Sequence, residues 1–136
     1  MSRLVQEIIP NDYEETIAIG LSFPLTVGTT YQNFTTAKQI HDNLRNLILT
    51  IPGERVYYPT FGCGLYHLLY EPLSDGELEP AATIAVEEAV EEWMPYVSIS
   101  SIQISSSPTE SKMNIKVQYR VNGWEASNIL NLDVSL

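Results

Sequence analysis

The chain has 136 residues, of which 44% are hydrophobic and 18% charged, a composition typical of one globular domain. Seventeen acidic residues against seven scattered basic ones give a formal net charge of −10, which argues against a nucleic-acid partner. No apolar run approaches the roughly 20 residues of a membrane helix, and the N-terminus lacks a secretory pattern, so we expect no membrane partner. The single cysteine cannot form an internal disulfide, as expected of a protein that folds in cytoplasm.

The N-terminal part of the sequence is irregular. Residues 1–17 are predicted to form an arm, and residues 18–136 a single domain. The stretch IAIGLSFPL (17–25) is the only strand-like piece before the first helix. Gly20 and Pro24 predict a short strand or one at a sheet edge, and a first strand or an arm is equally possible here.

Two helices are predicted in the middle of the chain. From Thr35 to Thr50 apolar residues recur every three or four positions, which predicts an amphipathic helix with a threonine available as its N-cap. The segment GLYHLLYEPL (64–73) follows and predicts a short helix that stops before Pro72. Its apolar side is formed by Leu65, Leu68 and Leu69.

A second long helix is predicted from 74 to 94, with Ser74 or Asp75 as its N-cap and Pro95 ending it. Its expected apolar side consists of Ile84, Ala85, Ala89 and Trp93, with Val86 and Val90 beside them. The opposite side carries Glu87, Glu88, Glu91 and Glu92. We interpret this acidic side as a solvated helix face, with a docking surface for a basic partner as the alternative.

The remainder of the chain is predicted to be strand. VSISSIQIS (97–105) changes parity at Ser100 and Ser101, which predicts a bulge or a bend. NIKVQYRV (114–121) alternates regularly, and Asn122 with Gly123 is a strong hairpin signal. A last alternating strand places Leu130, Leu132, Val134 and Leu136 on one side. Helices followed by about three antiparallel strands predict an α+β domain, with two long helices and one short helix packed on the apolar sheet face.

No motif in the sequence strongly indicates a catalytic, metal-binding or cofactor-binding site. Cys63 and His67 lie four residues apart and could pair as thiolate and imidazole, but nothing orients the base, and His41 lies on the first helix. The same three residues lack the paired spacing of a zinc site. We therefore interpret Cys63 as a small buried packing residue and predict no catalytic residue, no metal and no cofactor.

Two carboxylates, Glu54 and Glu71, flank the segment PGERVYYPTFGCGLY (52–66) and would be the pair needed for glycoside hydrolysis. With seventeen acidic residues in the chain some such pair always exists, so the signal is non-specific. Glu54 is more simply an ion-pair partner of Arg55 or a turn residue. The glycines do not follow a phosphate-loop spacing, and no Gly-Lys-Ser or Gly-Lys-Thr follows them.

At NLRNLILTIPGERVYYPTFGCGLYHLLYEPL (43–73) the sequence resembles the small baseplate wedge proteins of contractile-tailed phages and their type VI secretion counterparts. In that family a helix rich in Leu and Ile ends in Thr, then Pro or Lys, then Gly and an Arg. A proline, one variable residue and Phe-Gly-Cys then lead into a short helix. The matching positions are Leu47, Leu49, Thr50, Pro52, Gly53, Arg55, Pro59, Phe61, Gly62, Cys63 and Leu65. The similarity covers roughly residues 18–136.

The end of the second long helix departs from the family pattern. There the family has an aromatic residue followed by Glu-Pro-Arg, whereas this chain has Trp93, Met94, Pro95 and Tyr96. Only Trp93 and Pro95 carry over, so this chain lacks the Glu and Arg that the family links to core and wedge contacts. A Met and a Tyr could fill the same place by apolar packing.

The resemblance implies a structural protein of the virion tail baseplate, made in host cytoplasm and present in multiple copies in a ring. It implies contacts with other baseplate wedge proteins and with the tail sheath protein, and a fold like that of the sheath domain. We expect the last strand, with Leu130, Leu132 and Val134, to dock the sheath by strand addition. Some members have been labelled lysozyme-like, so a peptidoglycan hydrolase acting during infection is the alternative.

Overall fold

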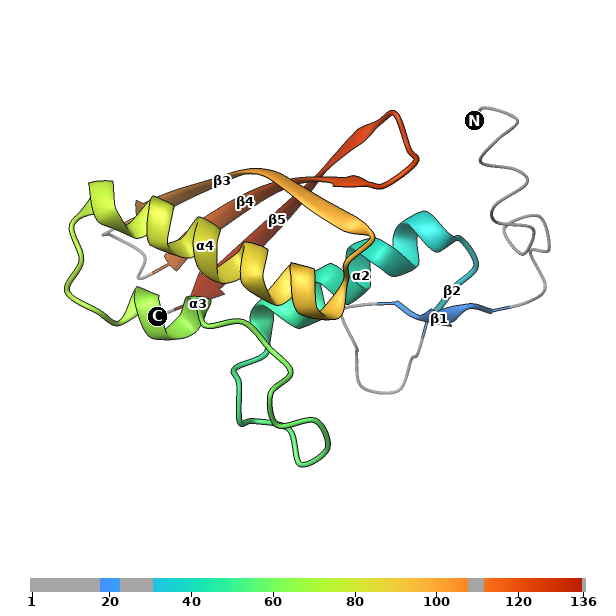
Figure 1. Cartoon of the computed structure of the whole chain (residues 1–136), viewed down its shortest axis with the longest axis horizontal. Helices are drawn as coiled ribbons and strands as arrows, with labels where there is room; N and C mark the ends of the chain where they lie inside the picture. The colour runs from blue at the N-terminus through green and yellow to red at the C-terminus, as the bar shows by residue number, and fades with distance from the viewer. Residues whose placement is uncertain (1–17, 23–30, 108–111, 136) are drawn as a thin grey trace. The chain divides into compact units, whose positions relative to one another are not determined.

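The computed structural model describes residues 18–22, 31–107 and 112–135, which fall into two units, residues 1–44 and 45–136 (Figure 1). Each unit is described by itself. Helix α2 (Thr36–Leu49) begins in the first unit, and its last residues belong to the second. Its bounds confirm the helix predicted from Thr35 to Thr50. Its buried apolar residues are Ile40, Leu44, Leu47 and Ile48.

The first unit contains two short strands and the start of α2. Strands β1 (Gly20–Leu21) and β2 (Gln32–Asn33) pair antiparallel, so the predicted first strand is short, as expected. Pro24 and the arm at residues 1–17 lie outside the described residues.

A buried polar network joins these strands to α2. The Asn33 side chain is fully buried, and its Nδ2 donates to Asp42 Oδ2 at 2.6 Å and to the Leu21 carbonyl at 3.2 Å. Asp42 is itself only 4% exposed. Buried polar groups need such partners, because an unmade hydrogen bond there is costly. This network could not be predicted from the sequence, since nothing in the local pattern marks Asn33 as buried.

The second unit is built on a three-stranded antiparallel sheet in the order β3-β4-β5. The strands are β3 (Val97–Ser107), β4 (Lys112–Val121) and β5 (Ser127–Ser135). This confirms the predicted α+β class and the three C-terminal strands. Because β4 lies in the centre, β3 and β5 form the two edges of the sheet.

The parity change in β3 is a bulge, as predicted. Ile99 lies opposite Tyr119, but Ile102 lies opposite Val117, so the strand has one extra residue between them. Tyr119 and Val117 are both buried on one face of β4. The bulge therefore keeps the apolar residues of β3 on that same face on both sides of the extra residue.

The connection between β4 and β5 begins with the predicted turn. Gly123 has φ 86°, which a glycine adopts without strain, and the Trp124 N–H donates to the Val121 carbonyl at 3.0 Å. Strand β5 starts only at Ser127, so the loop is longer than a two-residue hairpin.

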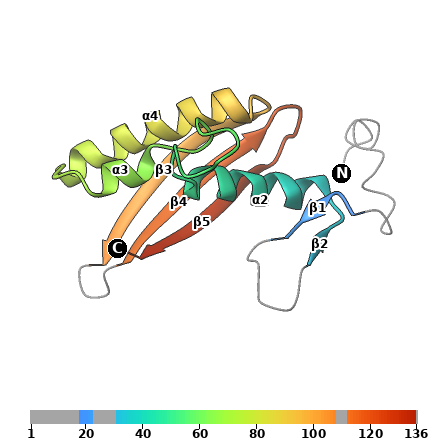
Figure 2. The same cartoon turned by 90° about the horizontal axis from the view of Figure 1, so that it is seen from below.

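Helices α3 (Leu65–Leu69) and α4 (Asp75–Trp93) confirm the other two predicted helices. Helix α4 packs along β3 and α3 packs against α4 (Figure 2). Ser74 is the N-cap of α4, and its backbone N–H and hydroxyl donate to the Glu77 carboxylate at 3.3 and 2.9 Å. That α2 also packs on the sheet stays a prediction. No helix in the described ranges is both long and apolar enough to cross a membrane.

The predicted apolar side of α4 is wrong at Ile84, which is 57% exposed. The buried residues are Leu78, Ala82, Val86, Ala89 and Val90. Ile84 is two residues from Ala82 and from Val86, and two residues turn a helix by about 200°. A stripe at spacings of three and four therefore leaves Ile84 on the opposite side.

Candidate functional site

The loop from 50 to 64, here called the motif loop, joins α2 to α3 and is held by its own backbone. The Gly53 N–H donates to the Pro59 carbonyl at 2.7 Å, and the Phe61 N–H to the Tyr58 carbonyl at 2.9 Å. At its base the Cys63 N–H donates to the Thr50 carbonyl at 2.9 Å. These bonds close the loop on itself, so the motif loop has a defined shape although most of it is exposed.

The two glycines of the motif loop that have positive φ serve this shape. Gly53 has φ 93° and Gly62 has φ 136°, both in the region that favours glycine. A Cβ at Gly62 would lie 2.5 Å from the Thr50 carbonyl oxygen. Gly62 is therefore required where the two ends of the loop approach each other.

Cys63 is 1% exposed, and its thiol donates to the Ala85 carbonyl of α4 at 3.5 Å. Burial raises the pKa of this thiol, although the backbone hydrogen bond with Leu65 lowers it. His67, by contrast, is exposed on α3. The structure therefore supports the interpretation of Cys63 as a packing residue and does not bring together a thiolate and an imidazole base.

We expect the raised thiol pKa to make stability fall in alkali. Above the ordinary value of 9.0 the unfolded chain releases the thiol proton while the folded protein keeps it. The free energy of unfolding should therefore decrease as pH rises from about 9 toward the folded pKa. Urea unfolding between pH 8 and 10 should show this component in the wild type and lack it in Cys63→Ala. An equal pH slope in both proteins would contradict it.

An aromatic cluster attaches the motif loop to the C-terminal end of α4. The Arg55 guanidinium lies 4.1 Å from the centroid of the Phe61 ring. Phe61 in turn meets Trp93 edge to face, with centroids 5.1 Å apart, and Tyr58 meets the same indole at 6.2 Å. The sequence motif includes Arg55, Phe61 and Trp93 but not Tyr58. It did not predict the contacts of Trp93, because Trp93 is far from the loop along the chain.

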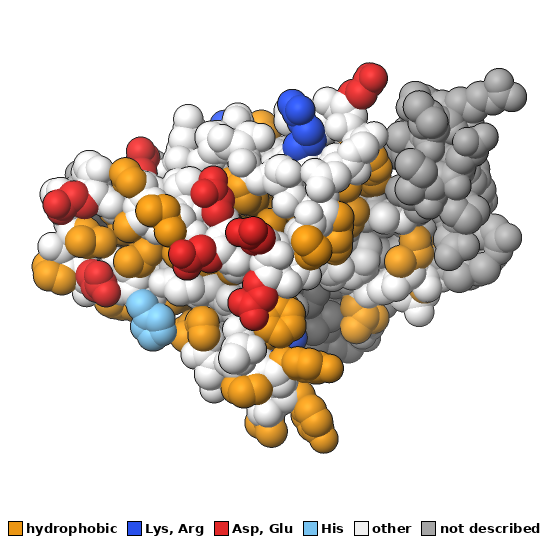
Figure 3. All heavy atoms as spheres, in the orientation of Figure 1, with side chains coloured by type: hydrophobic (Ala, Val, Ile, Leu, Met, Phe, Trp, Pro, Cys, Tyr) orange, Lys and Arg blue, Asp and Glu red, His pale blue; other side chains and the backbone are white. Residues whose placement is uncertain are grey.

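The tip of the motif loop is apolar and exposed. Val56 is 95% exposed, Tyr57 84% and Tyr58 70%. Apolar side chains project at the lower edge of Figure 3, where this loop lies in Figure 1. An exposed apolar tip on a loop that is held by its own backbone hydrogen bonds is typical of a protein contact surface.

Neither Glu54 nor Glu71, the two carboxylates considered for glycoside hydrolysis, has a position that indicates catalysis. Glu54 accepts a hydrogen bond from the Ile51 N–H at 3.1 Å, which is the turn role predicted for it. The ion pair predicted as an alternative is replaced by the contact of Arg55 with Phe61. Glu71 is exposed beyond α3. Within the described ranges no group of three His, Cys, Asp or Glu side chains could hold a metal ion.

Of the two residues that replace the family's Glu and Arg at the end of α4, only Met94 packs in the core. Met94 is 4% exposed, and its carbonyl accepts a hydrogen bond from the Val97 N–H at 2.9 Å. Tyr96 is 41% exposed. The Met therefore occupies the core where the family has Glu, and the Tyr stays at the surface.

The outer edge of β5 has a defined set of backbone groups. Val97 lies opposite Val121 in the sheet. The Asn122 N–H, one residue after Val121, donates to the Tyr96 carbonyl, one residue before Val97. In an antiparallel ladder such a bond flanks a non-hydrogen-bonded pair, so Val97 and Val121 do not bond to each other. Val121 and the alternate residues of β4 therefore direct their backbone groups toward β5. Their partners are Asn128, Leu130, Leu132 and Val134.

It follows that Ile129, Asn131, Asp133 and Ser135 direct their backbone N–H and C=O groups away from β4, along the free edge. The side chains of Leu130, Leu132 and Val134 are at most 2% exposed. These three residues hold β5 in the sheet. A partner at this edge would meet the intervening residues instead.

The second unit has an exposed apolar loop tip and, among the described residues, an unpaired outer edge of β5. Both features suit contact with other proteins. The chain belongs to the family of Baseplate wedge protein gp25, whose family model matches residues 35–125. Family membership gives it a structural role in a phage-type tail baseplate.

Two solved structures share the fold. A protein of Geobacter sulfurreducens, provisionally named a tail lysozyme, has a TM-score of 0.65 at 23% identity, covering 85% of this chain and 96% of its own. A chain of the anti-feeding prophage baseplate has a TM-score of 0.59 at 20% identity, covering 76% of this chain and 85% of its own. No curated protein matches the sequence.

Proposed function

We propose that this protein links the inner baseplate to the contractile sheath and nucleates sheath assembly by strand addition at β5. The observation that supports this most directly is the free edge of β5. There alternate residues present backbone donors and acceptors while the strand's apolar side chains are buried. An extended segment of the sheath protein would pair with this edge through main-chain hydrogen bonds.

The motif loop is the proposed contact with the other baseplate wedge proteins. Its tip, Val56 to Tyr58, offers apolar surface. The contacts of Arg55 with Phe61 and of Phe61 with Trp93 hold the loop against α4. The other family positions shape the loop or lie at the adjoining helix ends: Pro52, Gly53, Pro59, Gly62, Cys63, Leu65 and Pro95. A rigid aromatic tip binds a partner with little loss of conformational freedom. We also propose that several copies of the protein form a ring in the virion tail baseplate, which is assembled in host cytoplasm.

We propose no enzymatic activity. Glu54 is part of a turn and Glu71 is exposed, and the fold shared with the Geobacter protein carries no residue roles with it. Incubation of purified protein with peptidoglycan, with Glu54→Gln and Glu71→Gln alongside, tests the hydrolase alternative. Activity that disappears in either variant would establish the enzyme instead.

The strand-addition proposal predicts that Asn131→Pro assembles at least about tenfold fewer sheathed tails. The proline removes an outward N–H worth about 1 kcal/mol and places its ring where the neighbouring strand would lie, while the bonds to β4 remain. Tails assembled with each variant would be counted by electron microscopy.

Asn131→Ala is the matched control, because it keeps the backbone donor at the same exposed position. It should give normal numbers of sheathed tails. Circular dichroism and urea unfolding would verify that both variants are folded. Normal sheathed tails from a folded Asn131→Pro protein would overturn strand addition at β5.

A further inference from the structure

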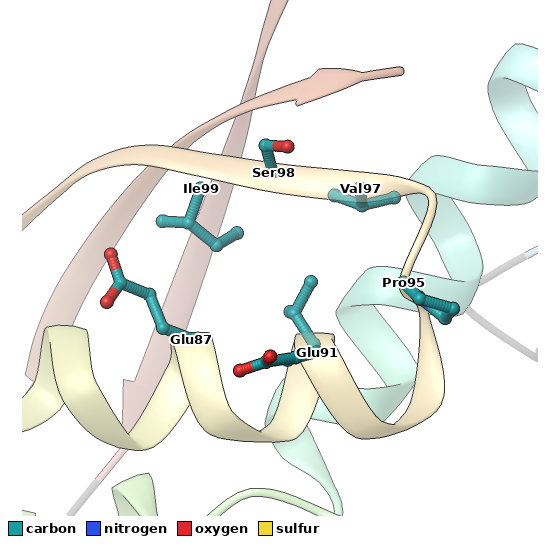
Figure 4. A pocket seen from close by; sticks show the side chains of 7 residues that line it. Glu87, Glu91, Pro95, Val97, Ser98 and Ile99 are labelled. Atoms are coloured by element: carbon teal, nitrogen blue, oxygen red, sulfur yellow. The ribbon is translucent and has the colours of Figure 1, made fainter.

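A groove lies between α4 and the start of β3, at the sheet edge opposite to β5. It has a volume of about 470 Å³ and is lined by Glu87, Val90, Glu91, Pro95, Val97, Ser98 and Ile99. Figure 4 shows Ile99 and Glu87 directed toward the space between the helix and the strand, and the Glu91 side chain lying along α4 toward Glu87. Among the residues that the structure describes, no Lys or Arg lines the groove.

Among the described residues no strand pairs with the outer side of β3, and two of the outward N–H groups of β3 have other partners. Since Val97 and Val121 form a non-hydrogen-bonded pair, Val97 and Ile99 direct their backbone groups away from β4. The Val97 N–H is taken by the Met94 carbonyl at 2.9 Å, and the Ile104 N–H by the Glu79 carboxylate at 3.2 Å. Between them Ile99 offers both a donor and an acceptor.

The two glutamates of the groove are spaced for an extended chain. Glu87 and Glu91 are exposed and one helical turn apart, a rise of about 6 Å along α4. Residues i and i+2 of a strand point to the same face and are about 6.7 Å apart. A strand added to β3 would therefore place two such side chains opposite the two carboxylates, because α4 packs along β3.

We propose that the α4–β3 groove binds an extended basic segment of another protein. The segment pairs its backbone with Ile99 and places Lys or Arg side chains, two residues apart, against Glu87 and Glu91. The charge of the groove and the net charge of −10 favour a basic occupant over a second copy of this acidic chain. The proposal concerns the edge opposite to β5 and does not depend on the proposed sheath contact.

The test measures binding of a fluorescent peptide, acetyl-Thr-Val-Lys-Val-Lys-Val-Thr, to the full chain by anisotropy. Glu87→Gln with Glu91→Gln should weaken binding about tenfold, since two exposed ion pairs are lost. Glu88→Gln with Glu92→Gln is the matched control, because it makes the same charge change one position away on α4, outside the groove. The control should change affinity less than about twofold.

Backbone pairing is tested with the protein unchanged. Two peptides methylated on opposite sets of alternate amide nitrogens should differ, one losing binding and the other keeping it, because only one set faces β3. Equal losses in the two double variants, no binding of the lysine peptide, or equal binding of both methylated peptides would overturn the proposal. Sedimentation showing a dimer that Glu87→Gln with Glu91→Gln strengthens would replace the basic segment with a second copy.

Discussion

Gly62→Ala is expected to destabilise the protein by about 3 kcal/mol or more and to disorder the motif loop. Its φ of 136° is a backbone conformation that side chains rarely adopt. The added Cβ would also lie 2.5 Å from the Thr50 carbonyl and 2.9 Å from the Pro52 nitrogen, both of which are backbone atoms. The loop would have to open at the Cys63–Thr50 hydrogen bond. Urea unfolding of the variant and the wild type measures the loss.

Gly64→Ala provides the control two residues further along. Its φ is −71°, and a Cβ there would meet nothing within 4 Å. We expect a change of less than about 1 kcal/mol, with either sign. Equal stabilities of Gly62→Ala and Gly64→Ala would show that the loop tolerates a side chain at its closure.

Leu132→Ala is expected to cost about 2 to 5 kcal/mol, because the Leu132 side chain is 1% exposed and its removal leaves a cavity in the sheet core. The same burial means that deleting β5 would remove core residues along with the proposed sheath contact. Thermal or urea unfolding measures the loss, and a substantial part of the folded population should disappear at physiological temperature.

Ile129→Ala is the matched control on the same strand. Ile129 is 46% exposed on the opposite face, so truncating it should cost about 1 kcal/mol or less. A cost for Ile129→Ala as large as that for Leu132→Ala would mean that both faces of β5 are buried.

The sequence predicted the fold well where a regular apolar pattern extends over many residues. The alternation of β4, the slip in β3 and the caps of α4 are local signals, and each corresponds to an observed feature. The sequence misplaced Ile84, because a helix rich in alanine and glutamate has apolar residues on more than one side. The two-residue strand β2 carries too little pattern to be predicted.

The candidate site was only partly predictable. Gly62 and Cys63 could be named from the motif, and the burial of Cys63 was predicted. Their partners, the Thr50 carbonyl at the other end of the loop and the Ala85 carbonyl of α4, are distant in sequence and could not be predicted. The contact of Arg55 with the face of the Phe61 ring is local, but the edge-to-face contact of Phe61 with Trp93 depends on how α4 returns past the loop. The sheet order, and with it the identity of the two edges, is also a tertiary property that no short sequence pattern specifies.

The hydrogen bond from Ile104 to Glu79 has a consequence for the lifetime of the free subunit. An uncovered edge strand is a template for aggregation, and a sheet with two edges could grow into a filament of identical copies. Glu79 occupies one backbone donor of β3, and Asp133 places negative charge beside the edge of β5. Copies that carry these carboxylates repel one another, so the protein can remain dispersed until a chain of different charge arrives.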